Sequence, residues 1–303
     1  AYVRLYEFSR DLSISELLNE SEPFYLAFSL LADALSMNFI GHNLLIALFC
    51  IFSLTLFSRN FKYSILFIVA AFPLIHLMAF AGFVRQGLAF SCLLIAVYFL
   101  QKRGFLIAIF FSGLAFLAHN SALIMATILV LCPIPDARKK LKYLLIISLA
   151  SISYIAINYD FSRMLVYVNF QRMVAEYLNA NLVSKGAFFK GSLIFLSAAY
   201  LLLKSKRIQD DTLRAFLISG CVISILISSL IFLIYPLALF DRLLIYSYHI
   251  VPIVVLMTSH LLSRGGKNIL MVIVPSFFSI VTLNFWLLFA NHSSLWMPYR
   301  FSV

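Results

Sequence analysis

Charged and hydrogen-bonding side chains stand beside long apolar segments in this 303-residue chain. Arg85 lies between two such segments, His119 and Ser121 end another, and Arg242 and Tyr246 begin a later one. Arginine binds phosphate through a planar fork of donors, and a neutral histidine can accept a proton. These residue types predict phosphate binding combined with general-base chemistry, provided that the fold brings them together.

The residues that follow Arg85 bear on its role. An arginine at the edge of an apolar segment often extends to lipid headgroups, which is the alternative to a phosphate ligand. Gln86, Gly87 and Ala89 come next in the sequence, and small residues of this kind let a helix pack closely against others. We therefore expect Arg85 at a helix start that faces protein, with Gln86 lining the same site.

Two groups are candidates for the general base. His119 is the first, because imidazole takes up a proton near neutral pH; the alternative is a buried histidine bonded to a backbone carbonyl or to Ser121. Glu22 is the second, and its alternative is an acid favoured at a helix start by the macrodipole. Tyr246 follows Arg242 by about one turn, where an interfacial anchor is the alternative to a substrate contact.

The composition predicts the fold class. Hydrophobic residues make up 63% of the chain and charged residues only 12%, with a mean hydropathy of +1.00. Apolar runs of membrane-spanning length recur throughout, and a backbone that crosses lipid must be helical so that its amides are paired within each segment. We predict an all-α polytopic membrane protein with a single membrane-embedded domain over residues 1–303.

Cysteines and histidines show no metal-binding pattern. The histidines are dispersed along the chain, which argues against a zinc site. All four cysteines fall inside apolar runs, so we expect buried thiols and no disulfide framework at Cys50, Cys92, Cys132 and Cys221. Neither a metal nor a cofactor is expected.

Short basic connections predict the orientation of the chain. Together with Lys142 and Arg214, which start the spans that follow, they hold 14 of the 23 Lys and Arg residues but only 3 of the 12 acids, so they mark the cytoplasmic side. The same placement accounts for the net charge of +11 without nucleic acid as a partner. Ten spans that leave both ends outside are predicted at 41–57, 63–80, 87–101, 105–118, 120–132, 142–158, 187–203, 212–235, 241–262 and 268–290.

The apolar run 104–134 is expected to cross outward and return, turning at residues 119–121. Each arm has about 14 residues and is roughly 21 Å long, which is short for a hydrocarbon core of about 30 Å. Either the membrane is thinned there or the pair is a re-entrant hairpin. In both cases the turn places His119 at the outer surface, at the same depth as Arg85 and Arg242.

Two further outer regions are expected. Residues 1–40 form an outer segment with a short interfacial helix at 23–38, and residues 160–186 form a long loop rich in groups that bind sugars. Candidate substrate-binding residues in these regions and at the C-terminus are Arg4, Arg163, Arg172, Tyr299 and Arg300.

The chain carries five short motifs in a fixed order: EPFY at 22–25, VRQGLAF at 84–90, AHNSALI at 118–124, DRLLIYS at 241–247 and WMPYR at 296–300. In their order and spacing, these motifs resemble the EpsG-like, Wzy-type bacterial polysaccharide polymerases of O-antigen or exopolysaccharide synthesis. That family shows Arg-Gln opening one helix, His-x-Ser near the end of the next apolar run, Arg followed by Tyr in a late span, and Pro-Tyr near the C-terminus. The family usually has one more span before the point at which this chain begins, with Ala1 rather than Met, so we expect a preceding N-terminal segment.

The resemblance implies an enzyme of the bacterial inner membrane, similar in plan to GT-C glycosyltransferases, with its active site facing the periplasm. It would move a growing glycan from undecaprenyl pyrophosphate onto a lipid-linked oligosaccharide repeat unit. Arg85 and Arg242 would stabilise the departing pyrophosphate, and His119 or Glu22 would act as the base. The implied partners are the lipid-linked oligosaccharides and the bilayer, with a chain-length regulator protein as a further candidate.

Two other functions fit the same sequence. An O-antigen ligase or another lipid-linked glycosyltransferase shares the substrate class and differs in the acceptor. A flippase or transporter of lipid-linked sugars is also polytopic, but transporters tend to have internal repeats and charges near the midplane. No such repeat is found here, and the charged candidates lie near one interface.

Overall fold

In the computed structural model, the residues described are 2–10, 12–13, 16, 22–123, 125–126, 129, 187–208, 210–233, 242–263 and 269–289. These residues form helices joined by turns, and no strand occurs among them. The predicted all-α class is therefore confirmed for this part of the chain.

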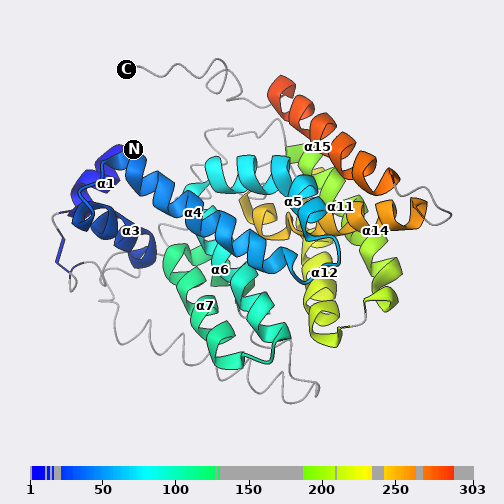
Figure 1. The fold of residues 1–303 in the computed structure, drawn as a ribbon, viewed down its shortest axis with the longest axis horizontal. Coiled ribbons are helices and arrows are strands. Elements are labelled where there is room, and N and C mark those ends of the chain that lie inside the picture. The colour runs from blue at the N-terminus through cyan, green and yellow to red at the C-terminus, as the bar shows by residue number, and fades with distance from the viewer. Residues whose placement is uncertain are drawn as a thin grey trace.

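Two short helices lie together at the N-terminal end (Figure 1). α1 spans Tyr2–Arg10 and α3 spans Pro23–Ala34, which begins with proline because the first helical turn has no use for its N–H. Arg10 and Asp33 join the two helices in an ion pair of 2.5 Å. The helix expected at 23–38 is thus present, and it ends at Ala34, four residues before the predicted end.

The next two spans differ in regularity. α4 is a continuous α-helix over Phe39–Ser58. The span predicted at 63–80 instead begins as α5, Ser64–Ala71, and continues as a π-helix, η1, over Phe72–Ala81. Pro73, at the start of η1, lacks the N–H that an α-helix would pair, so the hydrogen-bond pattern changes where the proline enters.

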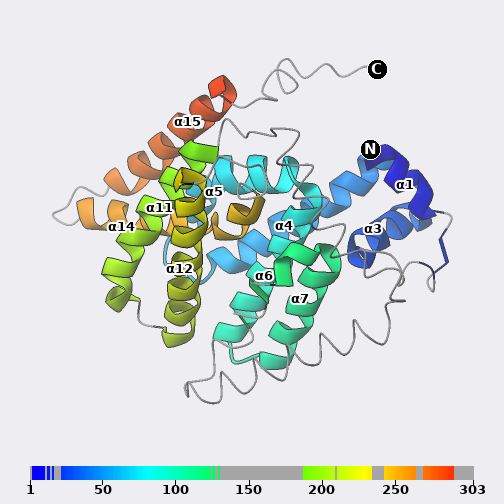
Figure 2. The same cartoon turned by 180° about the vertical axis from the view of Figure 1, so that it is seen from behind.

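A central pair of helices follows. α6 spans Val84–Gln101 and α7 spans Phe105–Ala118, and they lie side by side in both ribbon views (Figures 1 and 2). Every residue from Gln86 to Val97 is buried, so α6 faces protein on all sides. The corresponding span was predicted to start at residue 87, with Arg85 at the helix start. The helix begins three residues earlier, which places Arg85 within its first turn.

A short 3₁₀ turn, η2, follows α7, and the second half of the described chain adds further helices. Their bounds are η2 Asn120–Ala122, α11 Ala187–Lys204, η4 Ser205–Arg207, α12 Asp211–Leu233, η5 Leu244–Ser247, α14 Ile250–Leu262 and α15 Leu270–Phe289. α11 packs against α12 and α14, and α15 packs against α14 and α5. The span predicted at 241–262 includes a 3₁₀ turn, η5, which contacts both α6 and α12.

The described helices fit a multi-pass membrane protein. Five of them are long and apolar enough to cross a membrane: Phe39–Ser58, Val84–Gln101, Ala187–Arg207, Leu213–Phe232 and Leu244–Leu262. Four shorter apolar helices accompany them at Pro23–Ala34, Ser64–Phe80, Phe105–Ala118 and Leu270–Phe285. Ten crossings and a GT-C plan stay predictions, because the span at 142–158 and about half of the residues at 120–132 lie outside the described residues.

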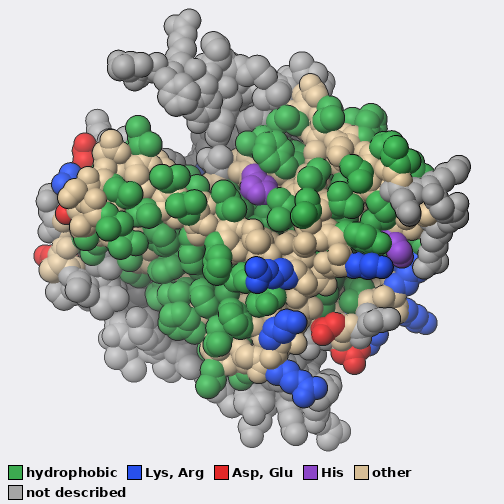
Figure 3. Space-filling view, in the orientation of Figure 1, with side chains coloured by type: hydrophobic (Ala, Val, Ile, Leu, Met, Phe, Trp, Pro, Cys, Tyr) green, Lys and Arg blue, Asp and Glu red, His purple; other side chains and the backbone are tan. Residues whose placement is uncertain are grey.

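The basic turns gather on one side of the molecule. Figure 3 shows Lys and Arg side chains toward the lower right, over the turns that join α6 to α7 and α11 to α12, with a broad apolar surface beside them. α6 has 18 residues, which corresponds to a length of about 27 Å. Arg85, in its first turn, is therefore separated from Lys102, which follows its last turn, by nearly the thickness of a hydrocarbon core.

Candidate functional site

Four segments meet at the end of the bundle opposite these basic turns. Glu22 precedes α3, Arg85 lies in the first turn of α6, His119 follows the last turn of α7, and Tyr246 lies in η5. Direct contacts described below connect them, although they are far apart in the sequence. Four of the predicted motifs have residues within the described part of the chain, and the structure brings all four to one place.

Glu22 and Arg85 form the central ion pair. Arg85 Nη1 donates to Glu22 Oε2 at 2.5 Å across 63 residues of sequence. The Glu22 side chain is only 10% exposed, whereas that of Arg85 is 38% exposed. Burial raises the pKa of Glu22 above its usual range, and the charge of Arg85 opposes that rise. The pair therefore encloses the carboxylate and leaves part of the guanidinium accessible to an anion.

His119 lies against the other oxygen of the same carboxylate. Its Nδ1 is 3.2 Å from Glu22 Oε1, without the alignment of a hydrogen bond. Burial, followed by the positive charges of Arg85 and Arg242, lowers the pKa of His119 from 6.5 to about 4. The carboxylate alone would favour the imidazolium, so desolvation and the two arginines outweigh it. At neutral pH the ring is uncharged and can accept a proton.

Arg242 belongs to the same cluster. It is exposed and stands two residues before η5, and its charge acts on His119. The positive charges of Arg85 and Arg242 thus both act on the same imidazole. Two guanidinium groups around one point form an electrostatic site suited to an anion that carries several oxygen atoms.

A short hydrogen-bond chain continues the site toward η5. The Ser121 and Tyr246 hydroxyls are 2.8 Å apart across 125 residues of sequence, and Gln86 Nε2 donates to Ser121 Oγ at the longer distance of 3.5 Å. Gln86 and Tyr246 are buried. This chain fixes the turn after α7 against α6 and η5, and it presents amide and hydroxyl groups of the kind that bind sugar hydroxyls.

Gly87 explains how α6 begins so close to η1. A Cβ atom at this position would lie 2.6 Å from Ala79 O and 3.0 Å from Phe80 Cα. Both obstacles are backbone atoms, which cannot rotate away as a flexible side chain would. Gly87 therefore lets α6 pack against η1, as predicted from the small residues there. This close packing positions the first turn of α6, which carries Arg85.

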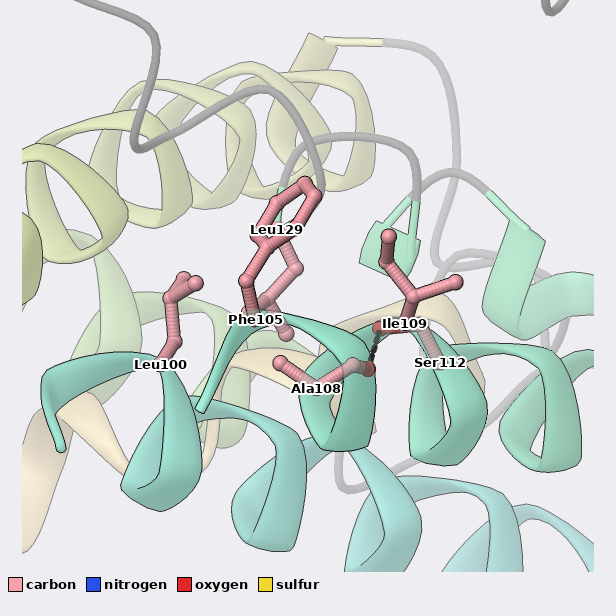
Figure 4. Close-up of a pocket in the computed structure, with 6 residues that line it drawn as sticks. All are labelled: Leu100, Phe105, Ala108, Ile109, Ser112 and Leu129. Carbon is pink, nitrogen blue, oxygen red and sulfur yellow. Dashed lines mark hydrogen bonds between the residues drawn. The ribbon is translucent and has the colours of Figure 1, made fainter. Parts of the chain in front are cut away.

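One hollow in the described part of the chain borders this site, and another lies apart from it. The second is shallow and lies near the opposite end of α7 (Figure 4), where Leu100, Phe105, Ala108, Ile109, Ser112 and Leu129 line it. Its polar side chain, Ser112, donates to Ala108 O within its own helix. That hollow offers no chemistry. The hollow beside Ser121 and Tyr246 is lined mainly by apolar side chains.

Several predicted residues lie outside what the structure describes. The side chain of Arg4 is not described, although its backbone belongs to α1. The outer loop predicted at 160–186 also lies outside the described residues. The same holds for Arg163, Arg172, Tyr299 and Arg300, whose roles stay predictions.

One buried cation was missed by the sequence analysis. Lys190, in the first turn of α11, is only 8% exposed, and α11 contacts η5, the element that carries Tyr246. The sequence did place this lysine at the outer end of the span predicted at 187–203, and that position could have marked it as a candidate for the site. The direct pairing of Glu22 with Arg85 was also not predicted, because the two were assigned separate roles.

The described residues offer little for metal binding. No group of three or more His, Cys, Asp and Glu side chains within the described ranges is placed to hold a metal ion. Cys50, Cys92 and Cys221 are buried free thiols, as predicted, and Cys132 lies outside those ranges. The chemistry available here comes from arginine, histidine, carboxylate and hydroxyl groups.

The fold and the site define a multi-pass α-helical membrane protein with a cluster of arginine, histidine and glutamate at one end of its helices. The sequence model of the EpsG family matches residues 1–301. The chain therefore belongs to the EpsG family, which is related to the Wzy-like polysaccharide polymerases, and the predicted resemblance is confirmed. Searches of curated proteins and of solved structures gave no match.

Proposed function

We propose that this chain is a polysaccharide polymerase of the bacterial inner membrane with its active site facing the periplasm. It moves a growing glycan from undecaprenyl pyrophosphate onto a lipid-linked oligosaccharide repeat unit. The observation that carries this proposal is the Glu22 carboxylate between Arg85 and His119, at helix ends in a chain of the EpsG family. Family membership supports a membrane polymerase, and the groups in the cluster support transfer from a pyrophosphate.

The reaction exchanges one bond at the anomeric carbon. A hydroxyl of the acceptor sugar attacks that carbon while its bond to the pyrophosphate oxygen breaks, and the leaving pyrophosphate keeps the bonding electron pair. The proton of the hydroxyl passes to a base on the protein. No oxidant, reductant or nucleotide sugar is needed for this exchange.

Arg85 and Arg242 meet the charge that develops on the leaving group. Donors placed where negative charge appears in the transition state supply a large part of catalysis in many enzymes. Arg85 is 38% exposed, so an arriving pyrophosphate can reach its guanidinium. Arg242 is exposed and acts on the same imidazole, so both arginines can serve one leaving group.

His119 is the base, and Glu22 holds it in position. A proton on His119 Nδ1, which lies 3.2 Å from Glu22 Oε1, leaves Nε2 free to take the acceptor proton. The pKa of about 4 keeps the ring neutral at pH 7. When pyrophosphate binds, its charge offsets that of the arginines and the proton affinity of His119 rises. The base therefore strengthens when the donor is in place.

Glu22 and the incoming pyrophosphate compete for Arg85. The carboxylate holds the guanidinium at 2.5 Å and so occupies part of the place that a phosphate oxygen would take. Once the phosphate binds Arg85, the electrostatic hold of Arg85 on Glu22 weakens, and the carboxylate is left to stabilise a protonated His119. Donor binding and activation of the base are then coupled through one carboxylate.

Other groups complete the proposed substrate site. Gln86, Ser121 and Tyr246 bind sugar hydroxyls beside the reacting centre. The two lipid-linked substrates require further cations and hydrogen-bonding groups, which we assign to Arg4, Arg163, Arg172, Tyr299 and Arg300. A chain-length regulator protein is a candidate partner, and no cofactor takes part.

Deletion of the gene tests the function. Surface polysaccharide limited to single repeat units on the anchor supports the polymerase, whereas loss of all repeats points to a ligase or a flippase. Complementation with His119→Ala should leave single repeats, while His260→Ala, at the basic end of α14, should restore long glycan. Normal chain lengths with His119→Ala would remove His119 as the base.

A further inference from the structure

A fully buried histidine lies where three helices meet at the N-terminal end of the chain. His42 belongs to the first turn of α4 and has no solvent exposure. The centroid of its ring is 5.4 Å from that of Tyr6 on α1, 5.2 Å from that of Tyr25 on α3 and 6.1 Å from that of Phe39 on α4. His42 is thus a common contact of α1, α3 and α4, whose arrangement can be followed in Figures 1 and 2.

The imidazole also makes a directed contact with α3. Ser29 is buried on that helix, and its hydroxyl is within hydrogen-bonding distance of His42 Nδ1, at 3.4 Å. Ring contacts allow centroid distances over a range of about 4.5–7 Å, whereas a hydrogen bond depends strongly on direction and distance. The histidine therefore fixes the position of α3 on α4 more closely than an apolar ring would.

The helix that contacts His42 also carries Glu22 at its start. Tyr25 and Ser29 are one turn apart on α3, and both contact His42. Glu22 stands three residues before Tyr25, and its backbone carbonyl accepts from Leu26 N at 3.2 Å. Because this bond ties Glu22 to the first turn, any tilt or shift of α3 on α4 moves the carboxylate with it.

The Glu22 side chain is directed to other helices and not to its own. It makes no capping hydrogen bond with α3, although acidic residues at helix starts are often caps. Its Oε2 meets Arg85 on α6 at 2.5 Å, and its Oε1 lies 3.2 Å from His119 at the end of α7. Both contacts therefore depend on where α3 lies relative to the two central helices.

We propose that His42 is a positioning residue for glycan transfer, an inference that rests on the proposed function. It holds α3 on α4 so that Glu22 meets Arg85 and His119 at the distances the reaction needs. A displacement of about 1 Å in a catalytic arrangement can lower a rate about a hundredfold. His42 contacts neither of the two groups that Glu22 joins, so its effect on the rate passes through Glu22.

Single-turnover glycan transfer in two backgrounds tests this proposal. His42→Leu removes the ring contacts and the contact with Ser29, and it should lower the rate of the otherwise wild-type protein at least about tenfold. In a Glu22→Gln protein the same change should alter the residual rate less than about twofold, because the group through which His42 acts is already lost. Equal losses in the two backgrounds would overturn the proposal, since a general loss of folded protein lowers both rates by the same factor.

Two further variants keep the test decisive if His42→Leu folds poorly. Ser29→Ala removes a single long hydrogen bond and should lower the rate about two- to fivefold, a loss that should disappear in the Glu22→Gln background. Phe57→Leu is the matched control on α4, because this ring is fully buried as well and its ring contacts within the described chain lie outside α1 and α3. Any loss that Phe57→Leu causes should be the same in both backgrounds.

Hydrogen exchange of the full-length proteins in lipid nanodiscs gives a readout that does not depend on glycan synthesis. Loss of the ring contacts should accelerate exchange of the α3 amides about tenfold in His42→Leu, whereas Phe57→Leu should leave α3 unchanged. Equal exchange of α3 in the wild type and in His42→Leu would contradict this inference alone. Faster exchange of α3 in His42→Leu, combined with no transfer by the wild type from lipid-linked repeats, would contradict the proposed function alone.

Discussion

Replacing Glu22 by glutamine distinguishes two roles of this carboxylate: positioning His119 as the base, or only holding Arg85 in place. The change keeps the shape of the side chain and removes its charge from both Arg85 and His119. If Glu22 only holds Arg85, the loss is that of a partly exposed ion pair, because the arginine is 38% exposed. Such a pair contributes about 1 kcal/mol, so transfer would fall only about fivefold.

A carboxylate that positions and stabilises the base accounts for much more. General-base catalysis contributes about 10²- to 10⁴-fold, equivalent to about 3–5 kcal/mol in the transition state. We therefore expect Glu22→Gln to lower single-turnover glycan transfer at least about a hundredfold with purified lipid-linked repeat units. The structural reason is that one carboxylate contacts both the imidazole and the guanidinium.

The chain supplies a matched control in a second ion pair. Arg10 and Asp33 are also 2.5 Å apart, but their side chains are 48% and 39% exposed. Asp33→Asn should change the rate by no more than about twofold, as expected for a surface pair. A Glu22→Gln protein that keeps a fifth or more of the wild-type rate would refute the reasoning and leave Glu22 as an anchor.

Three further predictions concern the same site. Arg85→Gln removes one of the charges that lower the pKa of His119 to about 4, so this pKa should rise toward 6.5 and the residual transfer rate should begin to fall at a higher pH when the solution is acidified. Arg85→Lys keeps the charge, so its rate should fall at nearly the same acidic pH as that of the wild type. An Arg85→Gln protein with the acidic pH dependence of the wild type would contradict this. Gly87→Ala meets backbone at 2.6 Å, whereas a Cβ at Gly113 meets nothing within 4 Å. Gly87→Ala should lower the free energy of unfolding by about 1–3 kcal/mol, whereas Gly113→Ala should leave it unchanged or raise it by up to about 1 kcal/mol. Equal shifts of the unfolding temperature of the two variants in detergent would refute the close packing of Gly87 as the cause. Tyr246→Phe removes one hydrogen bond, worth about 0.5–1.5 kcal/mol, and should reduce transfer about two- to tenfold in the same single-turnover assay; an unchanged rate would exclude the hydroxyl from the site.

Hydropathy and charge predicted much of the helical architecture. The predicted spans at 41–57, 105–118 and 187–203 agree closely with α4, α7 and α11, because long apolar runs bounded by basic turns leave few alternatives. The change of α5 into a π-helix and the 3₁₀ turn η5 were missed. Apolar residues give the same hydropathy signal in every helical form, so such local changes depend on tertiary packing.

The sequence predicted which residues belong to the candidate site, but not which of them form ion pairs with each other. Topology alone placed Arg85, His119 and Arg242 at one depth, and the structure brings all three to one cluster. That Glu22 would bridge Arg85 and His119 could not be derived in this way. Depth in the membrane fixes one coordinate, whereas an ion pair requires the lateral arrangement of helices, which depends on close contacts such as that of Gly87 with η1.

The hydrogen bond between Ser121 and Tyr246 also constrains how the protein is made. Its two partners are 125 residues apart, a stretch that takes roughly 6 to 25 seconds to synthesise at about 5–20 residues per second. During that interval Glu22, Arg85 and His119 are already in the growing chain while η5 has not emerged from the ribosome. A chain that stops before η5 therefore carries the charged groups without the element that completes their surroundings, so the full site arises only late in biogenesis.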